Sequence, residues 1–209
     1  KRTFIVLKAE NALADGTTYT GTPATEDEKA TLFGEGQFIF SGEGSLTVTA
    51  TGKSGIVSDD YVHFISGTIA VNVSSSVNVS GSDTLKPACV RGKDYVKMTD
   101  GALSLTSTGT GGKGIKSSGT YTQGLSDGTG PILTVSTSGS TLGSGSSGGG
   151  GWGPGGGMGG SSGSSAKAIK VQGAITIYGG ETTVNTKTDG AEGLESKTSI
   201  DFKGGKHYF

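Results

Sequence analysis

The chain is poor in the residue types on which several functional classes depend. It contains 1 cysteine, 4 prolines, 1 tryptophan and 2 histidines among 209 residues. Because Cys89 is alone, no disulfide can form within the chain. No apolar run approaches the roughly 18 residues that cross a bilayer, so we expect no transmembrane segment. A formal net charge of −1 lacks the basic excess that drives nucleic-acid binding.

Hydrophobic residues are also scarce, at 31%, while 41 residues are glycine. A compact core of ordinary shape would be hard to fill, whereas a solenoid buries only a thin layer between neighbouring coils. We interpret residues 1–209 as a single elongated domain. Neither end reads as a terminal cap, so we expect a fragment of a longer chain whose secretion signal lies upstream.

The apolar residues alternate with polar ones over short stretches, which is typical of strands, and helix signals are nearly absent. Six segments share an aliphatic residue, a variable residue and usually Ser or Gly: residues 32–34, 56–58, 90–92, 115–117, 169–171 and 194–196. Their aliphatic positions are 24, 34, 25, 54 and 25 residues apart. This spacing predicts an all-β fold, a parallel β-helix with coils of about 25 residues, each carrying about three short strands.

Two of these spacings, 34 and 54 residues, exceed the length of one coil and predict insertions. One lies between Val73 and Pro87, and the other falls mostly within residues 142–165. The second is so rich in Gly and Ser that we expect a flexible loop. It carries Trp152, which would either stack on a sugar ring or fold back against the flank of the β-helix.

The variable position of the repeat holds three cations, Arg91, Lys116 and Lys170. Their aliphatic neighbours point inward, so these side chains should point outward on adjacent coils. Opposed like charges are destabilising. Either the side chains splay into water, or the column receives an acidic polymer such as a polyuronate. Glu195 would end the column or pair with Lys170.

Carboxylates gather at several turns and suggest a metal site. The candidates are Asp59, Asp60, Asp189, Glu192 and Glu195. Such oxygen-rich turns can hold Ca²⁺, which takes six to eight oxygen ligands. The alternative is that they are solvated turn residues. We identify no catalytic residue, because His63 and Cys89 have no partners that the sequence can assign.

Several motifs resemble a family of bacterial surface proteins known as carbohydrate-binding domain-containing. These motifs are Gly55-Ile56-Val57-Ser58-Asp59-Asp60, Gly67-Thr68-Ile69-Ala70-Val71, Lys113-Gly114-Ile115-Lys116-Ser117 and Asp189-Gly190-Ala191-Glu192-Gly193-Leu194-Glu195-Ser196-Lys197. The resemblance implies a right-handed parallel β-helix that is exported to the bacterial cell surface, often as a lipoprotein. It also implies binding of acidic polysaccharide with Ca²⁺ at the turns.

Three functions remain open. The favoured one is a non-catalytic, extracellular carbohydrate-binding protein that contacts its glycan through Arg91, Lys116, Lys170 and Trp152. The second is a structural or adhesive stalk, or a subunit of a surface complex. The third is a polysaccharide lyase that uses Ca²⁺ and one of the three cations as its base.

Overall fold

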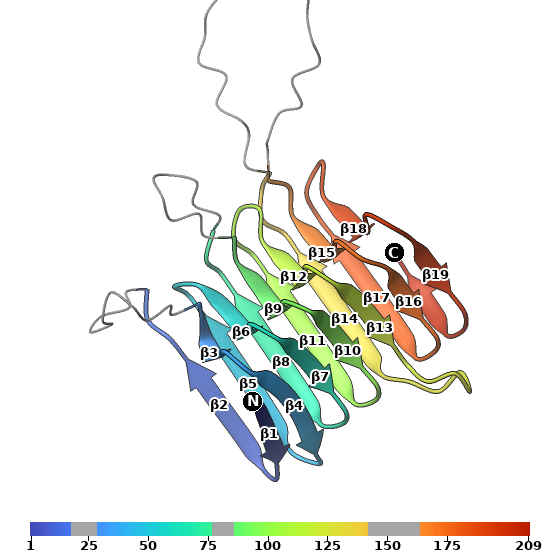
Figure 1. Ribbon diagram of the computed structural model, residues 1–209. Coiled ribbons are helices and arrows are strands. Elements are labelled where there is room, and N and C mark those ends of the chain that lie inside the picture. Colours follow the sequence, from blue (N-terminus) through green and yellow to red (C-terminus); the bar gives the residue numbers. More distant parts are fainter. Residues whose placement is uncertain (18–28, 77–85, 142–163) are drawn as a thin grey trace, which may run out of the picture.

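The computed structural model describes residues 1–17, 29–76, 86–141 and 164–209 (Figure 1). These residues form 20 strands and no helix. Within the described ranges there is therefore no helix that is long and apolar enough to cross a membrane.

The strands lie in three sheets, and the chain visits each sheet in turn. Sheet A contains β1 (Arg2–Leu7), β4 (Gln37–Gly42), β7 (Tyr61–Phe64), β10 (Tyr95–Met98), β13 (Thr120–Gln123), β16 (Ile175–Ile177) and β19 (Ile200–Phe202). Sheet B contains β2 (Glu10–Ala14), β5 (Ser45–Ala50), β8 (Thr68–Val73), β11 (Ala102–Ser107), β14 (Ile132–Thr137), β17 (Glu181–Thr186) and β20 (Lys206–Tyr208). Sheet C contains β3 (Ala30–Gly34), β6 (Ser54–Ser58), β9 (Ala88–Gly92), β12 (Lys113–Ser117), β15 (Lys167–Val171) and β18 (Glu192–Glu195).

The six aligned segments of the sequence are the strands of sheet C. Ile115 pairs with Val90 on one side and with Ile169 on the other, and the neighbouring pairs continue to Leu32 and Leu194. Every strand pair in the three sheets is parallel. The predicted all-β, parallel architecture is confirmed, and it is consistent with a β-helix.

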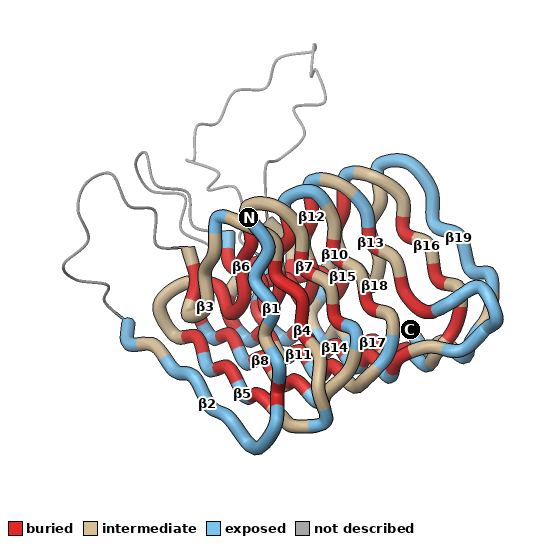
Figure 2. Tube along the Cα trace, turned by 60° about the horizontal axis from the view of Figure 1, so that its bottom comes forward, coloured by how far each residue is buried: buried red, intermediate tan, exposed pale blue. Residues whose placement is uncertain are grey.

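The interior is a continuous apolar column, because equivalent positions of successive strands stack about 4.8 Å apart. Figure 2 shows the buried positions alternating with exposed ones along the strands. Ile56, Val90, Ile115 and Ile169 are fully buried in this core, as the repeat predicted. The stacking thus lets a chain with few hydrophobic residues build a packed interior.

Three strands of sheet C, β9, β12 and β15, depart from simple alternation at one point. Ile115 is fully buried, and a Cβ added to the preceding Gly114 would lie 2.4 Å from the buried Val135 Cγ1. The equivalents of Gly114 are Cys89 and Ala168, which are also fully buried. Two consecutive residues therefore face the core in β9, β12 and β15.

The recurring serine of the repeat closes the turn after three strands of sheet C, β6, β12 and β18. Ser58 Oγ donates to Gly36 O (2.8 Å) and accepts from the Asp60 amide (3.0 Å). Ser117 and Ser196 make the same two kinds of bond. At the next turn Gly101 has a φ of 86°, which explains why glycine recurs there.

Both predicted insertions lie largely outside the described residues. Residues 77–85 and 142–163 are not described, so the expected flexibility of 142–165 and the role of Trp152 stay predictions.

We predict that Gly114→Ala destabilises the fold. The new methyl group would meet Val135 Cγ1 at 2.4 Å and Ala168 O at 2.5 Å. Such overpacking should lower the free energy of unfolding by about 1–3 kcal/mol, measured by chemical denaturation. Gly16→Ala is the control, because a Cβ there meets nothing within 4 Å. Equal stability of the two variants would contradict the tight packing between sheets B and C.

Candidate functional site

Three cations form a column across sheet C. Lys116 pairs with Arg91 in the register of β12 and β9, and with Lys170 in that of β12 and β15. The column continues to Val57 on β6 and to Glu195 on β18. The side-by-side placement predicted from the sequence is present; its role in binding stays a prediction.

A second column of lysines lies beside the first and was missed in the sequence. Lys113 pairs with Lys167, two residues before the core positions Ile115 and Ile169. Because two consecutive residues face the core, Lys113 and Lys116 both lie on the outer face. The signal that could have revealed them is the repeated Lys-x-Ile-Lys of residues 113–116 and 167–170.

Lys113 is covered by the chain that enters β15. Its side chain is almost fully buried, and its Nζ donates to Ser165 O (2.7 Å), Ser164 Oγ (3.2 Å) and Gly111 O. These acceptors are neutral, so they solvate the ammonium group without cancelling its charge.

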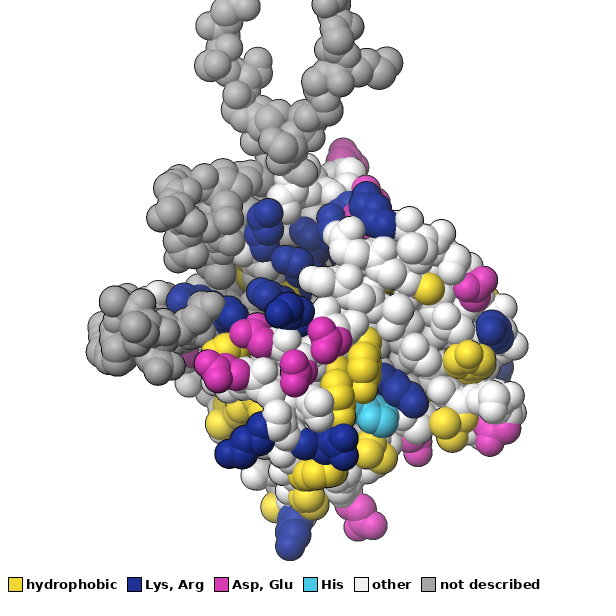
Figure 3. Space-filling view, in the orientation of Figure 1, with side chains coloured by type: hydrophobic (Ala, Val, Ile, Leu, Met, Phe, Trp, Pro, Cys, Tyr) yellow, Lys and Arg dark blue, Asp and Glu magenta, His cyan; other side chains and the backbone are white. Residues whose placement is uncertain are grey.

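We use the name cationic face for Arg91, Lys113, Lys116, Lys167 and Lys170 on β9, β12 and β15. Figure 3 shows dark-blue side chains gathered over these strands, with an acidic patch next to them. Arg91, Lys113 and Lys116 form no ion pair with any residue that the structure describes.

Burial and neighbouring positive charges lower the pKa of two lysines. Burial lowers the pKa of Lys113 to about 7, and the charges of neighbouring lysines, Lys170 first, act in the same direction. Burial also lowers the pKa of Lys116 to about 8, with further contributions from Arg91, Lys86 and Lys170. Part of the cationic face therefore titrates near neutral pH.

Glu195 neutralises one end of the cationic face. Its Oε2 lies 2.8 Å from Lys167 Nζ and 3.3 Å from Lys170 Nζ, and its Oε1 lies 3.1 Å from Lys197 Nζ. Glu192 also pairs with Lys167. Burial alone would raise the pKa of Glu195, but the hydrogen bonds and charges of the lysines outweigh it and lower the pKa to about 2.

The carboxylates proposed for calcium are not brought together. Asp59 Oδ2 accepts from Lys29 Nζ at 2.7 Å, and Asp60 follows it at the turn after β6. Asp189 precedes β18, at the other side of sheet C, and its carbonyl oxygen accepts from Thr141 Oγ1 (3.1 Å).

Three of these five carboxylates already pair with lysines. Glu192 and Glu195 already accept lysine ammonium groups, and Asp59 accepts another. No group of three or more His, Cys, Asp or Glu residues in the described ranges is arranged to hold a metal ion. Binding of Ca²⁺ at these turns stays a prediction.

Cys89 and His63, which were also singled out in the sequence, do not belong to the cationic face. Cys89 is fully buried, its Sγ lies 3.3 Å from Thr106 O, and burial raises the pKa of its thiol. It is a packed core residue. His63 is half-buried on the outer face of sheet A and bonds Thr99 Oγ1 at 2.7 Å.

A family model described as "Carbohydrate-binding domain-containing protein" matches residues 1–209. No curated protein and no solved structure matches the chain.

We predict that Glu195→Gln destabilises the protein at neutral pH. The Glu195 side chain is 16% exposed, and its loss leaves Lys170 without a carboxylate partner and Lys167 with Glu192 alone. The free energy of unfolding should fall by roughly 2–3 kcal/mol at pH 7. Because folding depresses the pKa of Glu195, this stability is present above its ordinary value of 4.5 and disappears as the pH falls towards 2.

The measurement is chemical denaturation of both proteins between pH 7 and pH 2. The control is Glu43→Gln, at an exposed turn between β4 and β5, which should change stability by less than about 0.5 kcal/mol. A Glu195→Gln deficit that stays constant down to pH 2 would contradict the ion-pair account.

Proposed function

Because the chain belongs to the carbohydrate-binding domain-containing protein family, we propose that it binds an acidic polysaccharide across the cationic face of sheet C. The family supports a carbohydrate-binding role, and the cationic face supports an acidic ligand. One observation carries the choice of ligand: Arg91 and Lys116, side by side on β9 and β12 and only partly buried, have no carboxylate partner among the described residues.

Such a face is costly unless something neutralises it. Like charges on directly opposed positions of neighbouring strands destabilise a sheet. The chain supplies carboxylates only at the β18 end, through Glu192 and Glu195. A polyanion lying across β9 and β12 would supply the missing counter-charges, and carboxylate groups accept charge-assisted hydrogen bonds from both Arg and Lys.

The shape of the face favours a polymer over a small molecule. Its cations repeat across the strands about every 4.8 Å, in a line that crosses β9, β12 and β15. A linear polyuronate presents a carboxylate on each sugar, so several sugars could be held at once. Each contact can then be weak while the combined affinity is useful.

The wider setting is part of the proposal. We infer that the coils wind in the right-handed sense, as nearly all parallel β connections do. The proposed location is the outer surface of a bacterial cell, where acidic polysaccharides are accessible. No catalytic step is assigned, and the family's binding role supports a non-enzymatic function.

We predict that removing two unpaired cations weakens binding of polygalacturonate. The double variant Arg91→Gln/Lys116→Gln should raise the dissociation constant by about tenfold or more at low salt, because each lost charge removes a contact that depends on ionic strength. The measurement is isothermal titration calorimetry at several salt concentrations. Lys97→Gln, on the outer face of sheet A, is the control and should bind like the wild type.

Three outcomes would contradict this proposal in different ways. Failure of the wild type to bind acidic or neutral polysaccharides, with or without calcium, would favour the structural stalk. Binding that the double variant retains would move the site away from sheet C. Release of unsaturated uronates during the titration would favour the lyase, with a lysine or Arg91 as its base.

As the pH rises, binding should begin to weaken well below the pKa of an ordinary lysine. Lysine is cationic only below its pKa, and the pKa values of Lys113 and Lys116 are lowered to about 7 and about 8. Affinity for polygalacturonate should therefore fall between pH 6 and about pH 9, a range in which an unperturbed lysine keeps its charge. Lys116→Arg, which remains charged, should show a flatter pH profile. A wild-type affinity that is constant over this range would contradict the account.

A further inference from the structure

Two tyrosines form a stacked pair on the outer face of sheet A. Tyr61 on β7 pairs with Tyr95 on β10, and their ring centroids lie 4.4 Å apart at an interplanar angle of 11°. Because neighbouring strands are about 4.8 Å apart, the two rings face each other across the strands and stand upright on the sheet. Both side chains remain partly exposed. Figure 3 shows hydrophobic side chains gathered over β7 and β10, next to the acidic patch.

The stack is closed on one side and open on the other. On the Tyr61 side, Gln37 occupies the equivalent position of β4, and its Oε1 accepts from Arg2 Nε (3.1 Å). On the Tyr95 side, the paired residue on β13 is Thr120, which is exposed and too short to cover the whole of a phenol ring. Among the described residues, Tyr61 provides the one ring or cation contact of Tyr95. The Tyr95 face that points towards β13 is therefore available to a ligand.

Small residues continue beyond Thr120 and form a low floor beside the Tyr95 ring. Ala174 lies opposite Thr120 on the next coil, because the following residues of β13 and β16 are paired. Gly119 and Gly173 adjoin these two positions, and a Cβ on either glycine would collide with the backbone of a neighbouring turn. Larger side chains are thus excluded from the turns, and a flat ring above Thr120 could stack on Tyr95 as its partner does on the other side.

The charged groups around this step carry no net excess of either sign. Asp60 and Asp94 directly precede the two tyrosines, while Lys93 lies in the same turn as Asp94 and Lys97 lies in β10. Asp94 is exposed and forms no ion pair with a described residue. Burial, and then the charge of Lys97, lowers the pKa of the neighbouring His63, so that ring is predominantly neutral at pH 7. The surroundings therefore suit an uncharged ligand whose hydroxyl groups can donate to the Asp94 carboxylate.

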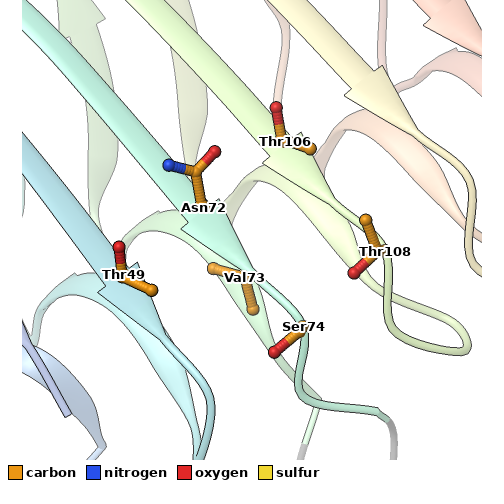
Figure 4. A pocket seen from close by; sticks show the side chains of 6 residues that line it. All are labelled: Thr49, Asn72, Val73, Ser74, Thr106 and Thr108. Carbon is orange, nitrogen blue, oxygen red and sulfur yellow. The ribbon is translucent and has the colours of Figure 1, made fainter.

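The outer face of sheet B offers no comparable contact. Figure 4 shows a hollow there, with Thr49, Asn72 and Thr106 pointing to the same side of their strands. Its volume is about 90 Å³, well below the roughly 300–1,000 Å³ of ordinary ligand pockets, and no aromatic ring lines it. Stacking is thus available on sheet A and not at this hollow.

We propose that the open face of Tyr95 binds a pyranose ring of a neutral, β-linked polysaccharide. The match to a carbohydrate-binding family supports a sugar as the flat ligand. The C–H groups on one face of a pyranose ring pack against the apolar face of an aromatic ring, while the sugar hydroxyl groups project from its rim. At the step, those hydroxyl groups would reach the Asp94 carboxylate and the Thr120 hydroxyl.

The stack with Tyr61 fixes the Tyr95 ring before a ligand arrives. Its geometry, with the centroids 4.4 Å apart, leaves the ring little freedom to lose when a sugar binds, which lowers the cost of association. The proposal shares the family's carbohydrate-binding role with the polyanion proposal, but it depends on sheet A and not on the cationic face of sheet C.

The experiment compares the full chain with Tyr95→Thr, Tyr95→Phe, Thr120→Arg and the control Tyr178→Thr. Thr120→Arg keeps the tyrosine pair and places a planar guanidinium group where it can stack over the open Tyr95 face. Tyr178 follows β16, and Lys203 Nζ lies 4.9 Å from its ring centroid, so a cation already occupies one face of that ring. The probes are cellohexaose, xylohexaose and mannohexaose, which are neutral and β-1,4-linked. Binding is measured by isothermal titration calorimetry, and chemical denaturation of every variant checks the fold.

The wild type and Tyr178→Thr should bind at least one of the three hexasaccharides with equal affinity. Tyr95→Thr and Thr120→Arg should each raise the Kd by about tenfold or more, because both remove the stacking surface. Tyr95→Phe should restore most of the affinity that Tyr95→Thr loses, because it keeps the ring face. Polygalacturonate should bind Tyr95→Thr as it binds the wild type, because its proposed site lies on sheet C.

No binding of any hexasaccharide by the wild type would overturn the proposal, as would wild-type affinity in Tyr95→Thr. An equal loss in Tyr95→Phe would also overturn it, because the hydroxyl group and not the ring face would then make the contact. The cationic face is tested separately, with polygalacturonate and the variant Arg91→Gln/Lys116→Gln, so either proposal can fail while the other stands.

Discussion

The in-register parallel pairing of successive strands is the constraint on which the rest of the structure depends. It places equivalent residues of the repeat about 4.8 Å apart, strand after strand. Inside, this stacks Ile56, Val90, Ile115 and Ile169 into one apolar column. Outside, it aligns any side chain that recurs in the repeat into a row, whether a lysine on sheet C or a threonine on sheet B. A chain with only 31% hydrophobic residues can therefore form both a core and extended, regular surfaces.

The same pairing places like charges side by side, and carboxylates of the chain neutralise them only at the β18 end of sheet C. Lys167 and Lys170 share the carboxylate of Glu195, whose pKa is lowered to about 2 as a result. Further along the sheet, Lys113 and Lys116 are held beside one another with lowered pKa values instead of carboxylate partners. The contrast between the two ends is the physical reason for proposing an external polyanion.

Much of the fold could be predicted from the sequence, because an aliphatic residue recurs at a spacing of 24 or 25 positions, lengthened twice by insertions, and so reports the register of sheet C directly. The outward column of Arg91, Lys116 and Lys170 followed from that register. Lys113 and Lys167 were missed because two consecutive residues face the core in these strands, which breaks the expected alternation. The ion pairs of Glu195 with lysines depend on side-chain positions that the spacing of residues alone does not reveal. The same is true of the buried hydrogen bond that Tyr121 donates to Gln123 (2.9 Å).

The most direct test of the central claim is an NMR titration of the lysine side-chain ammonium groups, assigned with single Lys→Arg variants, with and without polygalacturonate. The account predicts that Lys116 titrates near 8 in the free protein, and that its pKa rises when the polyanion supplies the missing counter-charge. Lys97, on sheet A, should not respond to the polymer. An ordinary pKa for Lys116 that the polymer leaves unchanged would contradict the claim that stacked, unpaired cations form the binding face.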